Sequence, residues 1–174
     1  MRRHPIMQSK IKSLASLAGV RRRLRRAGRS VVLTNGCFDL LHAGHVEYLE
    51  AAKRSGDVLV VALNGDRSVR ALKGAGRPLV PQAARAQLLA ALAAVDYVVV
   101  FNTVRVTPVI EALRPDVYVK GGDYTLDTLN AGERRVLEDC GATIKLLHLK
   151  PGYSTTALVE KLRRMFKLNA TGGL

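Results

Sequence analysis

The sequence predicts an α/β fold, in which a doubly wound parallel sheet of five strands forms a single domain. Short apolar runs alternate with helical patterns after residue 30, an order typical of parallel strands joined by helices. The length of 174 residues suits one domain, and 48% hydrophobic residues supply a core. In such a sheet, ligands bind at the carboxyl ends of the strands, near the point where the strand order reverses.

Each element follows from a local pattern. The apolar runs predict strands near residues 31–34, 57–63, 97–101, 117–120 and 143–148. The helical patterns predict helices near residues 43–55, 82–94, 107–113, 131–140 and 155–167. Pro81, Pro108 and Pro115 stand in turns or first helical turns, where a missing N–H costs little. The glycine-rich stretch 64–80 is expected to be a long loop, and the tail 169–174 to be disordered.

A basic N-terminal arm, residues 1–29, precedes the main domain, residues 30–168. It holds most of the excess positive charge, because ten Lys or Arg and no acid fall in the first 30 residues of a chain with formal net charge +14. Its apolar residues recur at near-helical spacing, at Ile11, Leu14, Leu17 and Leu24. This spacing predicts a basic amphipathic helix packed on the domain. A binding module for nucleic acid or an anionic surface is the non-enzyme alternative. No aromatic residues interleave with the arginines, so nucleic acid is not expected as a partner.

The composition also indicates in which cellular compartment the protein is expected. The longest apolar run, residues 88–95, is far shorter than a membrane span, and the N-terminal segment is too brief and polar for a signal peptide. We therefore expect a cytoplasmic protein without a membrane span. Cys37 and Cys140 match neither a disulfide framework nor a metal-ligand spacing, so both are expected to be free thiols.

The most informative motif, residues 34–45, follows the first apolar run and opens a predicted helix with His42 and His45. A helix start offers unpaired backbone N–H groups and a positive dipole end, which favour an anion. Residues three apart lie on one helix face, so both imidazoles are expected to face one ligand. The motif predicts a triphosphate site with nucleotide contacts at Thr34, Asn35, Gly36, Cys37, Phe38, Asp39 and Gly44. Within it, Phe38 is expected to pack beneath the turn.

These residues resemble the HIGH-type nucleotidyltransferases, Rossmann-like domains that carry His-x-Gly-His after the first strand. Three further segments, residues 63–78, 119–124 and 151–157, are similar to the adenylyltransferase domain of ADP-heptose synthase. The resemblance covers about residues 24–164 and implies ATP as donor and D-glycero-β-D-manno-heptose 1-phosphate as acceptor, giving ADP-heptose for lipopolysaccharide or a related surface glycan. In many relatives this domain is fused to a sugar kinase, so a separate heptose kinase is expected upstream.

Cations in the stretch 64–80 are expected to contact phosphates. Such a stretch can fold over a triphosphate and stabilise the charge that develops on the leaving pyrophosphate. The resemblance assigns this task to Lys73, whereas Arg67 and Arg70 are interpreted as solvated. Arg85 is expected to add a second phosphate contact or to be a surface residue. The remaining contacts to the acceptor are assigned to Asn64, Asp66, Arg77, Lys120 and Gly121.

The segment after the fourth predicted strand is expected to contact the nucleoside. Adjacent Gly121 and Gly122 permit close approach of a ring or sugar, and Asp123 can accept hydrogen bonds from a ribose or a base amine. The same Gly-Gly-Asp is also an ordinary turn. Its likeness to the family's Gly-Gly-Asp segment favours binding.

Three hydroxyl residues, Ser154, Thr155 and Thr156, begin the last predicted helix. One is expected to cap the helix, and the others to contact the nucleotide. Related cytidylyltransferases carry Arg-Thr before this segment, whereas this chain has Leu149 and Lys150. The difference favours the heptose type.

The expected reaction is in-line attack of a sugar 1-phosphate oxygen on the α-phosphorus of a nucleoside triphosphate. His42, His45 and Lys73 are the predicted catalytic residues, and they act with Mg²⁺ by positioning and charge neutralisation. Asp39 is expected to hold their geometry or to contact the metal through water.

Two enzyme alternatives use the same first motif. They are a cytidylyltransferase of glycerol 3-phosphate or a similar polyol phosphate, and an FMN adenylyltransferase. A homodimer is expected, because dimers are the commonest homo-oligomers.

Overall fold

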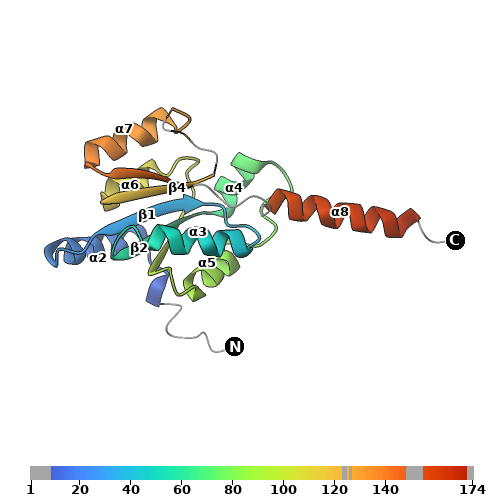
Figure 1. Ribbon diagram of the computed structural model, residues 1–174, viewed down its shortest axis with the longest axis horizontal. Helices are drawn as coiled ribbons and strands as arrows, with labels where there is room; N and C mark the ends of the chain where they lie inside the picture. The colour runs from blue at the N-terminus through green and yellow to red at the C-terminus, as the bar shows by residue number, and fades with distance from the viewer. Residues whose placement is uncertain (1–8, 123–124, 126, 148–154, 172–174) are drawn as a thin grey trace.

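The computed structural model describes residues 9–122, 125, 127–147 and 155–171 (Figure 1). Five strands form one parallel sheet in the order β3-β2-β1-β4-β5. They are β1 (Val31–Gly36), β2 (Val58–Asn64), β3 (Tyr97–Phe101), β4 (Val117–Gly121) and β5 (Thr143–Leu147). The chain winds outward from β1 through β2 and β3, then returns to pair β4 with the other side of β1. The predicted doubly wound parallel sheet of a single domain is confirmed, and its switch point lies between β1 and β4.

Helices cover both faces of the sheet. The helices in the described part of the chain are α2 (Leu14–Arg26), α3 (Ala43–Lys53), α4 (Asp66–Lys73), α5 (Gln82–Ala91), α6 (Thr107–Leu113), α7 (Ala131–Cys140) and α8 (Thr155–Thr171). Alternate strand residues face opposite ways, so Val31 and Leu33 pack against α2, α6 and α7, whereas Val32 packs against α3 and α5. Figure 1 shows α3 and α5 on one side of the sheet and α6 and α7 on the other. The helix α8 extends away from the sheet.

One helix was not predicted. Residues 66–73 form α4 inside the stretch expected to be a long loop. They contain neither glycine nor proline, and Ser68 and Val69 are buried against the domain. The glycines that suggested a loop lie just outside, because Gly65 is the N-cap and Gly74 ends the helix with φ of 88°. Among the other helices, α6 and α7 have the predicted bounds, and α8 runs past residue 167 to Thr171.

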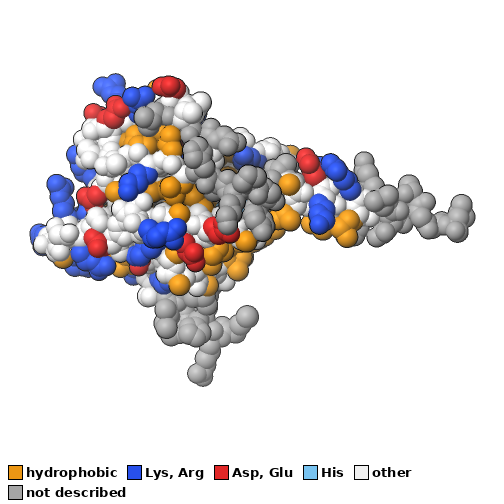
Figure 2. All heavy atoms as spheres, viewed as in Figure 1, with side chains coloured by type: hydrophobic (Ala, Val, Ile, Leu, Met, Phe, Trp, Pro, Cys, Tyr) orange, Lys and Arg blue, Asp and Glu red, His pale blue; other side chains and the backbone are white. Residues whose placement is uncertain are grey.

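The basic N-terminal helix packs on the domain through Leu14, Leu17 and Leu24, as their spacing predicts. Ile11 was predicted to belong to the same helix, but it precedes α2 and forms an isolated β-bridge with Val98. In α2, Leu17 and Val20 enter the core beside α6. Arg21 is also buried, and it donates to Leu113 O and forms an ion pair with Asp116 at 2.9 Å. Figure 2 shows Lys and Arg side chains around the end of the molecule that α2 forms. No helix in the described part of the chain combines the length and the apolar composition needed to cross a bilayer.

Candidate active site

A cavity of about 750 Å³ opens at the carboxyl ends of the strands. Residues 35–39 after β1 line it on one side, and residues 120–121 at the end of β4 line it on the other. Residues 72–73, 104–105 and 128–130 from three connecting segments complete much of the wall. The cavity therefore lies at the switch point, where doubly wound sheets bind their ligands.

The turn after β1 is shaped by Phe38. This residue has φ of 44° and only 6% of its surface exposed, so its ring folds back beneath the turn, as predicted. A Cβ on Gly36 would lie 2.9 Å from Phe38 Cε2, which explains the need for glycine. The thiol of Cys37 is free, as is that of Cys140, and burial raises the pKa of Cys37. A thiol with a raised pKa is a poor nucleophile, which agrees with a structural role for Cys37 in the turn.

The two predicted catalytic histidines lie together at the start of α3. His42 is the N-cap, and its ring stacks on that of His45 with centroids 3.8 Å apart. Of the two, His45 lines the cavity, while Gly44 is buried in the first turn of the helix. Burial, assisted by the charge of His42, lowers the pKa of His45 to about 4, and burial also lowers the pKa of His42. At neutral pH, the His45 ring that lines the cavity is therefore neutral, with one N–H to donate to a ligand.

Thr34 does not reach the cavity. Its side chain is fully buried, and Oγ1 lies 2.6 Å from the hydroxyl of Tyr48, which donates to Val119 O at 3.1 Å. The predicted contact of Thr34 with the nucleotide is therefore wrong, because the hydroxyl links β1 to α3. This bond and the Tyr48 bond to Val119 hold the helix that carries His45 against the sheet.

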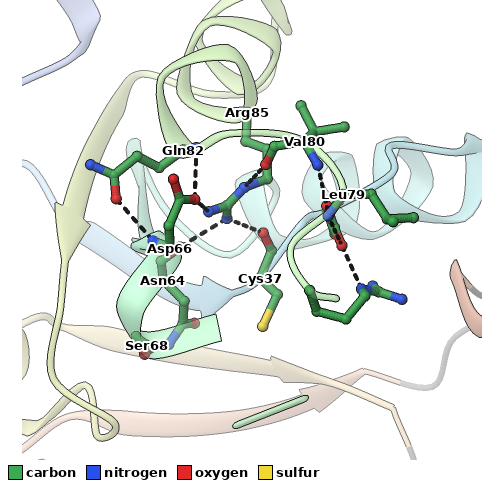
Figure 3. A network of polar contacts seen from close by, with 10 residues as sticks. Cys37, Asn64, Asp66, Ser68, Leu79, Val80, Gln82 and Arg85 are labelled. Atoms are coloured by element: carbon green, nitrogen blue, oxygen red, sulfur yellow. Dashed lines mark hydrogen bonds and ion pairs between the residues drawn. The ribbon is translucent and has the colours of Figure 1, made fainter. Parts of the chain in front are cut away.

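Asp39 joins the β1 turn to the segment after α4. Its carboxylate, 1% exposed, accepts hydrogen bonds from Leu79 N at 2.8 Å and Val80 N at 2.9 Å, and it pairs with Arg77 Nε at 2.6 Å. Figure 3 shows these contacts beside Leu79 and Val80. Of its two expected roles, the structure supports the holding of geometry, because three donors already occupy the carboxylate. Asp39 also lines the cavity, so its predicted contact with the nucleotide stays a prediction.

Lys73 and Arg77 bring positive charge to the same cavity. Lys73 is the last residue of α4, and Gly74 and Gly76 with φ of 88° and 86° turn the chain toward Arg77. Both cations line the cavity that His45 lines. His45 and Lys73, which the sequence predicts to act on the same triphosphate, therefore line one cavity.

Arg85 corrects a prediction. Its side chain is 0% exposed and donates to Cys37 O at 2.5 Å, Asn64 O at 2.8 Å and Val80 O at 2.8 Å. Its remaining contact is an ion pair with Asp66 at 2.7 Å. Figure 3 shows the guanidinium at the centre of this network. Arg85 is neither a substrate contact nor a surface residue, because its guanidinium donates to backbone carbonyls and to Asp66 in the segments that form the cavity wall.

Asp66 is likewise engaged within the protein rather than with an acceptor. Besides the contact to Arg85, its Oδ1 accepts from Gln82 N at 2.8 Å, and its own N–H donates to Gln82 Oε1 at 2.9 Å. This reciprocal pair ties the start of α4 to the start of α5 (Figure 3). Asn64 does line the cavity, but its amide donates to Ser68 Oγ at 2.8 Å.

Lys120 and Gly121, which are predicted to contact the acceptor, line the cavity at the end of β4. A Cβ on Gly121 would lie 2.5 Å from the Tyr48 ring, so close packing requires glycine here, and Gly122 has φ of 120°. Thr155 lines the cavity at the start of α8 and donates to Leu40 O at 3.4 Å. Asp123, Ser154 and the side chain of Thr156 lie outside the described residues.

Asn35 accepts hydrogen bonds from Tyr118 Oη at 2.6 Å and from Lys120 Nζ at 3.0 Å. It therefore fixes Lys120 at the switch point. Burial lowers the pKa of Lys120, and the charge of Glu133 opposes this shift. An incoming anion would stabilise this ammonium group.

Sequence reasoning missed several residues that line the cavity. They are Leu72, Val104, Arg105, Thr128, Leu129, Asn130 and Glu133. The sequence signal available was the Asn-x-x-Glu pattern at 130–133, which marks the start of α7. That pattern indicates a helix start and says nothing of a binding cavity, so only the fold reveals the position of Glu133.

The side chains of the site can also be examined as possible ligands of Mg²⁺. In the described part of the chain, no group of three or more His, Cys, Asp or Glu side chains could hold a metal ion. Mg²⁺ is commonly bound through substrate phosphates with one or two carboxylates and several waters. The Mg²⁺ expected from the nucleotide chemistry therefore stays a prediction.

A cavity at the switch point, lined by His45 near the start of a helix and by the cations Lys73, Arg77 and Lys120, is typical of a nucleotide-binding α/β enzyme. The chain belongs to the cytidylyltransferase-like family, whose profile matches residues 33–161. It is a nucleotidyltransferase with the HIGH-type motif at His42 to His45.

Curated relatives agree with this membership. The chain is 49% identical over 160 residues, 92% of its length, to the bifunctional protein HldE of Geotalea uraniireducens. It is 52% identical over 151 residues to the bifunctional protein HldE of Methylococcus capsulatus. In each case it covers 32% of the relative, so the chain spans about a third of the length of these proteins.

A solved structure has the same fold. The lipopolysaccharide core biosynthesis protein from Thermoplasma volcanium aligns with a TM-score of 0.60 and 28% sequence identity. The alignment covers 73% of this chain and 100% of that one.

Proposed function

We propose that this chain is an adenylyltransferase that joins ATP and D-glycero-β-D-manno-heptose 1-phosphate to give ADP-heptose and pyrophosphate. One observation carries the proposal: a single cavity at the switch point joins the triphosphate motif to a second group of charged residues around Lys120. Similarity to HldE proteins over 92% of the chain supports heptose chemistry. The absence of Arg-Thr at 149–150 favours ATP over CTP.

The reaction requires positioning rather than covalent catalysis. A phosphate oxygen of the sugar 1-phosphate forms a bond to the α-phosphorus, and the bond from that phosphorus to the bridging oxygen breaks. The electron pair leaves with pyrophosphate. Mg²⁺ carried by the triphosphate supplies charge neutralisation.

The residues that would act on the donor lie on two elements. The start of α3 presents the neutral imidazole of His45 to the phosphates, and the helix dipole favours their charge. Lys73 at the end of α4 neutralises the outgoing pyrophosphate. Asp39, through Arg77 and the backbone of residues 79–80, holds the segment that follows Lys73.

The assembly proposed is a homodimer that works with a separate heptose kinase. The exposed apolar side chains Leu158, Leu162 and Met165 on the projecting helix α8 support self-association. Sedimentation analysis of the purified chain tests this directly, since a monomer at micromolar concentration would contradict it.

An acceptor panel tests the activity. Pyrophosphate release is measured from ATP and from CTP, each with heptose 1-phosphate, glycerol 3-phosphate and FMN. The proposal predicts that ATP with heptose 1-phosphate has the highest kcat/KM. Preference for CTP with glycerol 3-phosphate, or for FMN with ATP, would replace it by one of the alternatives.

A further inference from the structure

One corner of the cavity gathers charged side chains that the nucleotide motifs do not include. Lys120 ends β4, Arg105 lies between β3 and α6, and Glu133 lies in the first turn of α7; all three line the cavity. The helices α6 and α7 pack on the face of the sheet opposite to α3. The corner therefore faces the triphosphate motif from across the switch point.

Glu133 is a buried residue that lines the cavity. It is 6% exposed and stands at the third position of α7, where its N–H donates to the N-cap Asn130 Oδ1 at 3.2 Å. In the usual capping box, the glutamate side chain returns to the N-cap N–H. Here Oε1 instead accepts a long 3.5 Å hydrogen bond from Val106 N. Within the described ranges, Oε2 makes no hydrogen bond.

A carboxylate in such a place is suited to a ligand that donates hydrogen bonds. Glu133 Oε2 is not among the buried side-chain atoms that lack a partner, so it is accessible from the cavity, where a ligand can donate to it. Lys120 is half-buried, and its ammonium group donates to Asn35 Oδ1 at 3.0 Å. Arg105 is exposed and adds a second cation that can form paired hydrogen bonds with phosphate oxygens.

We propose that this corner is the acceptor subsite, in which Lys120 and Arg105 bind the phosphate of a sugar 1-phosphate and Glu133 accepts hydrogen bonds from the sugar hydroxyls. This inference rests on the proposed function, because it names the place of the acceptor in the same reaction. The hydroxyl groups of a sugar can donate hydrogen bonds to the Glu133 carboxylate. A phosphate ester with an apolar organic group would instead cover this carboxylate without providing donors. Glu133 thus selects polyhydroxylated acceptors.

Kinetics and direct binding test the subsite together. ATP and D-glycero-β-D-manno-heptose 1-phosphate are used with wild type, Glu133→Gln and Arg105→Ala. Each change should raise the KM for heptose 1-phosphate by about tenfold or more, because it removes a charged hydrogen-bond partner. The KM for ATP should stay within about twofold of wild type. The exposed residues Glu111 and Arg135 supply the matched controls Glu111→Gln and Arg135→Ala, which should leave both KM values unchanged.

Calorimetric titration with heptose 1-phosphate, which needs no turnover, should show the same weakening. If wild type turns over heptose 1-phosphate and both variants keep its KM and Kd, the subsite is overturned and the function stands. If the KM for ATP rises as much as that for the acceptor, the corner belongs to the nucleotide and the subsite is overturned. If wild type binds heptose 1-phosphate without turnover and the variants lose binding, the subsite stands and the function fails. Absence of both binding and turnover overturns both.

Discussion

Replacing Arg85 by methionine tests whether this residue holds the cavity wall rather than substrate. Methionine keeps an unbranched side chain but removes the donors to three backbone carbonyls and to Asp66. An unsatisfied buried acceptor costs about 1 to 3 kcal/mol, and breaking a buried ion pair costs about 3 to 5 kcal/mol. Because the Asp66 side chain is 33% exposed, water replaces part of the lost contact. We therefore expect the free energy of unfolding to fall by about 3 to 5 kcal/mol.

For a domain of this size, each kcal/mol corresponds to about 2 to 4 °C, so the Tm of Arg85→Met should fall by roughly 6 to 20 °C. Calorimetric melting of the ligand-free protein measures this change. Arg134→Met is the matched control, since its ion pair with Glu138 lies in solvent and should not affect Tm measurably. An unchanged Tm for Arg85→Met with loss of ATP binding would refute the reasoning, because Arg85 would then be a ligand contact.

Three further outcomes follow from the site. Burial lowers the pKa of His45 to about 4, so between pH 6.5 and pH 4 the unfolded chain binds a proton on this ring while the folded chain does not. The contribution of the neutral His45 ring to the free energy of unfolding is therefore complete above pH 6.5 and falls as the pH drops toward 4. In urea unfolding, His45→Asn should therefore flatten the pH dependence across that window, and an unchanged slope would contradict the burial of the ring. Asp39→Asn should lower kcat/KM for ATP by about tenfold or more, because an amide cannot accept from every donor around the carboxylate. The control Asp139→Asn changes an exposed residue and should leave kcat/KM unchanged. Equal kinetics for the two variants would argue against the role of Asp39 in joining the β1 turn to the segment after Lys73. Lys73→Ala should lower kcat by about 10²-fold without changing the KM of the acceptor, and a change in acceptor KM alone would move Lys73 to the other substrate.

The strands and most helices could be predicted because their causes are local. Apolar runs of strand length between helical patterns determine a parallel sheet, and the bounds of α6 and α7 agree with their patterns to the residue. The helix α4 was missed because flanking glycines mask an eight-residue helix whose burial depends on its contact with β2. Local composition does not encode that contact.

The site residues also differ in how far local sequence could predict them. The start of α3 could be predicted, because a strand, a turn and a helix with His42 and His45 form one continuous segment. The sequence could not show whether Arg85 binds phosphate or protein carbonyls, since an arginine near the start of a helix has the same local sequence pattern in both cases. Glu133 was missed for the complementary reason: β4 and α7 bring it beside Lys120 only when the sheet has assembled.

A crystal structure of the protein with bound ATP tests the central claim most directly. We expect phosphate oxygens at about 3 Å from an imidazole nitrogen of His45 and from Lys73 Nζ, with the triphosphate at the start of α3. Triphosphate bound elsewhere, with the His45 ring packed away from it, would contradict the account.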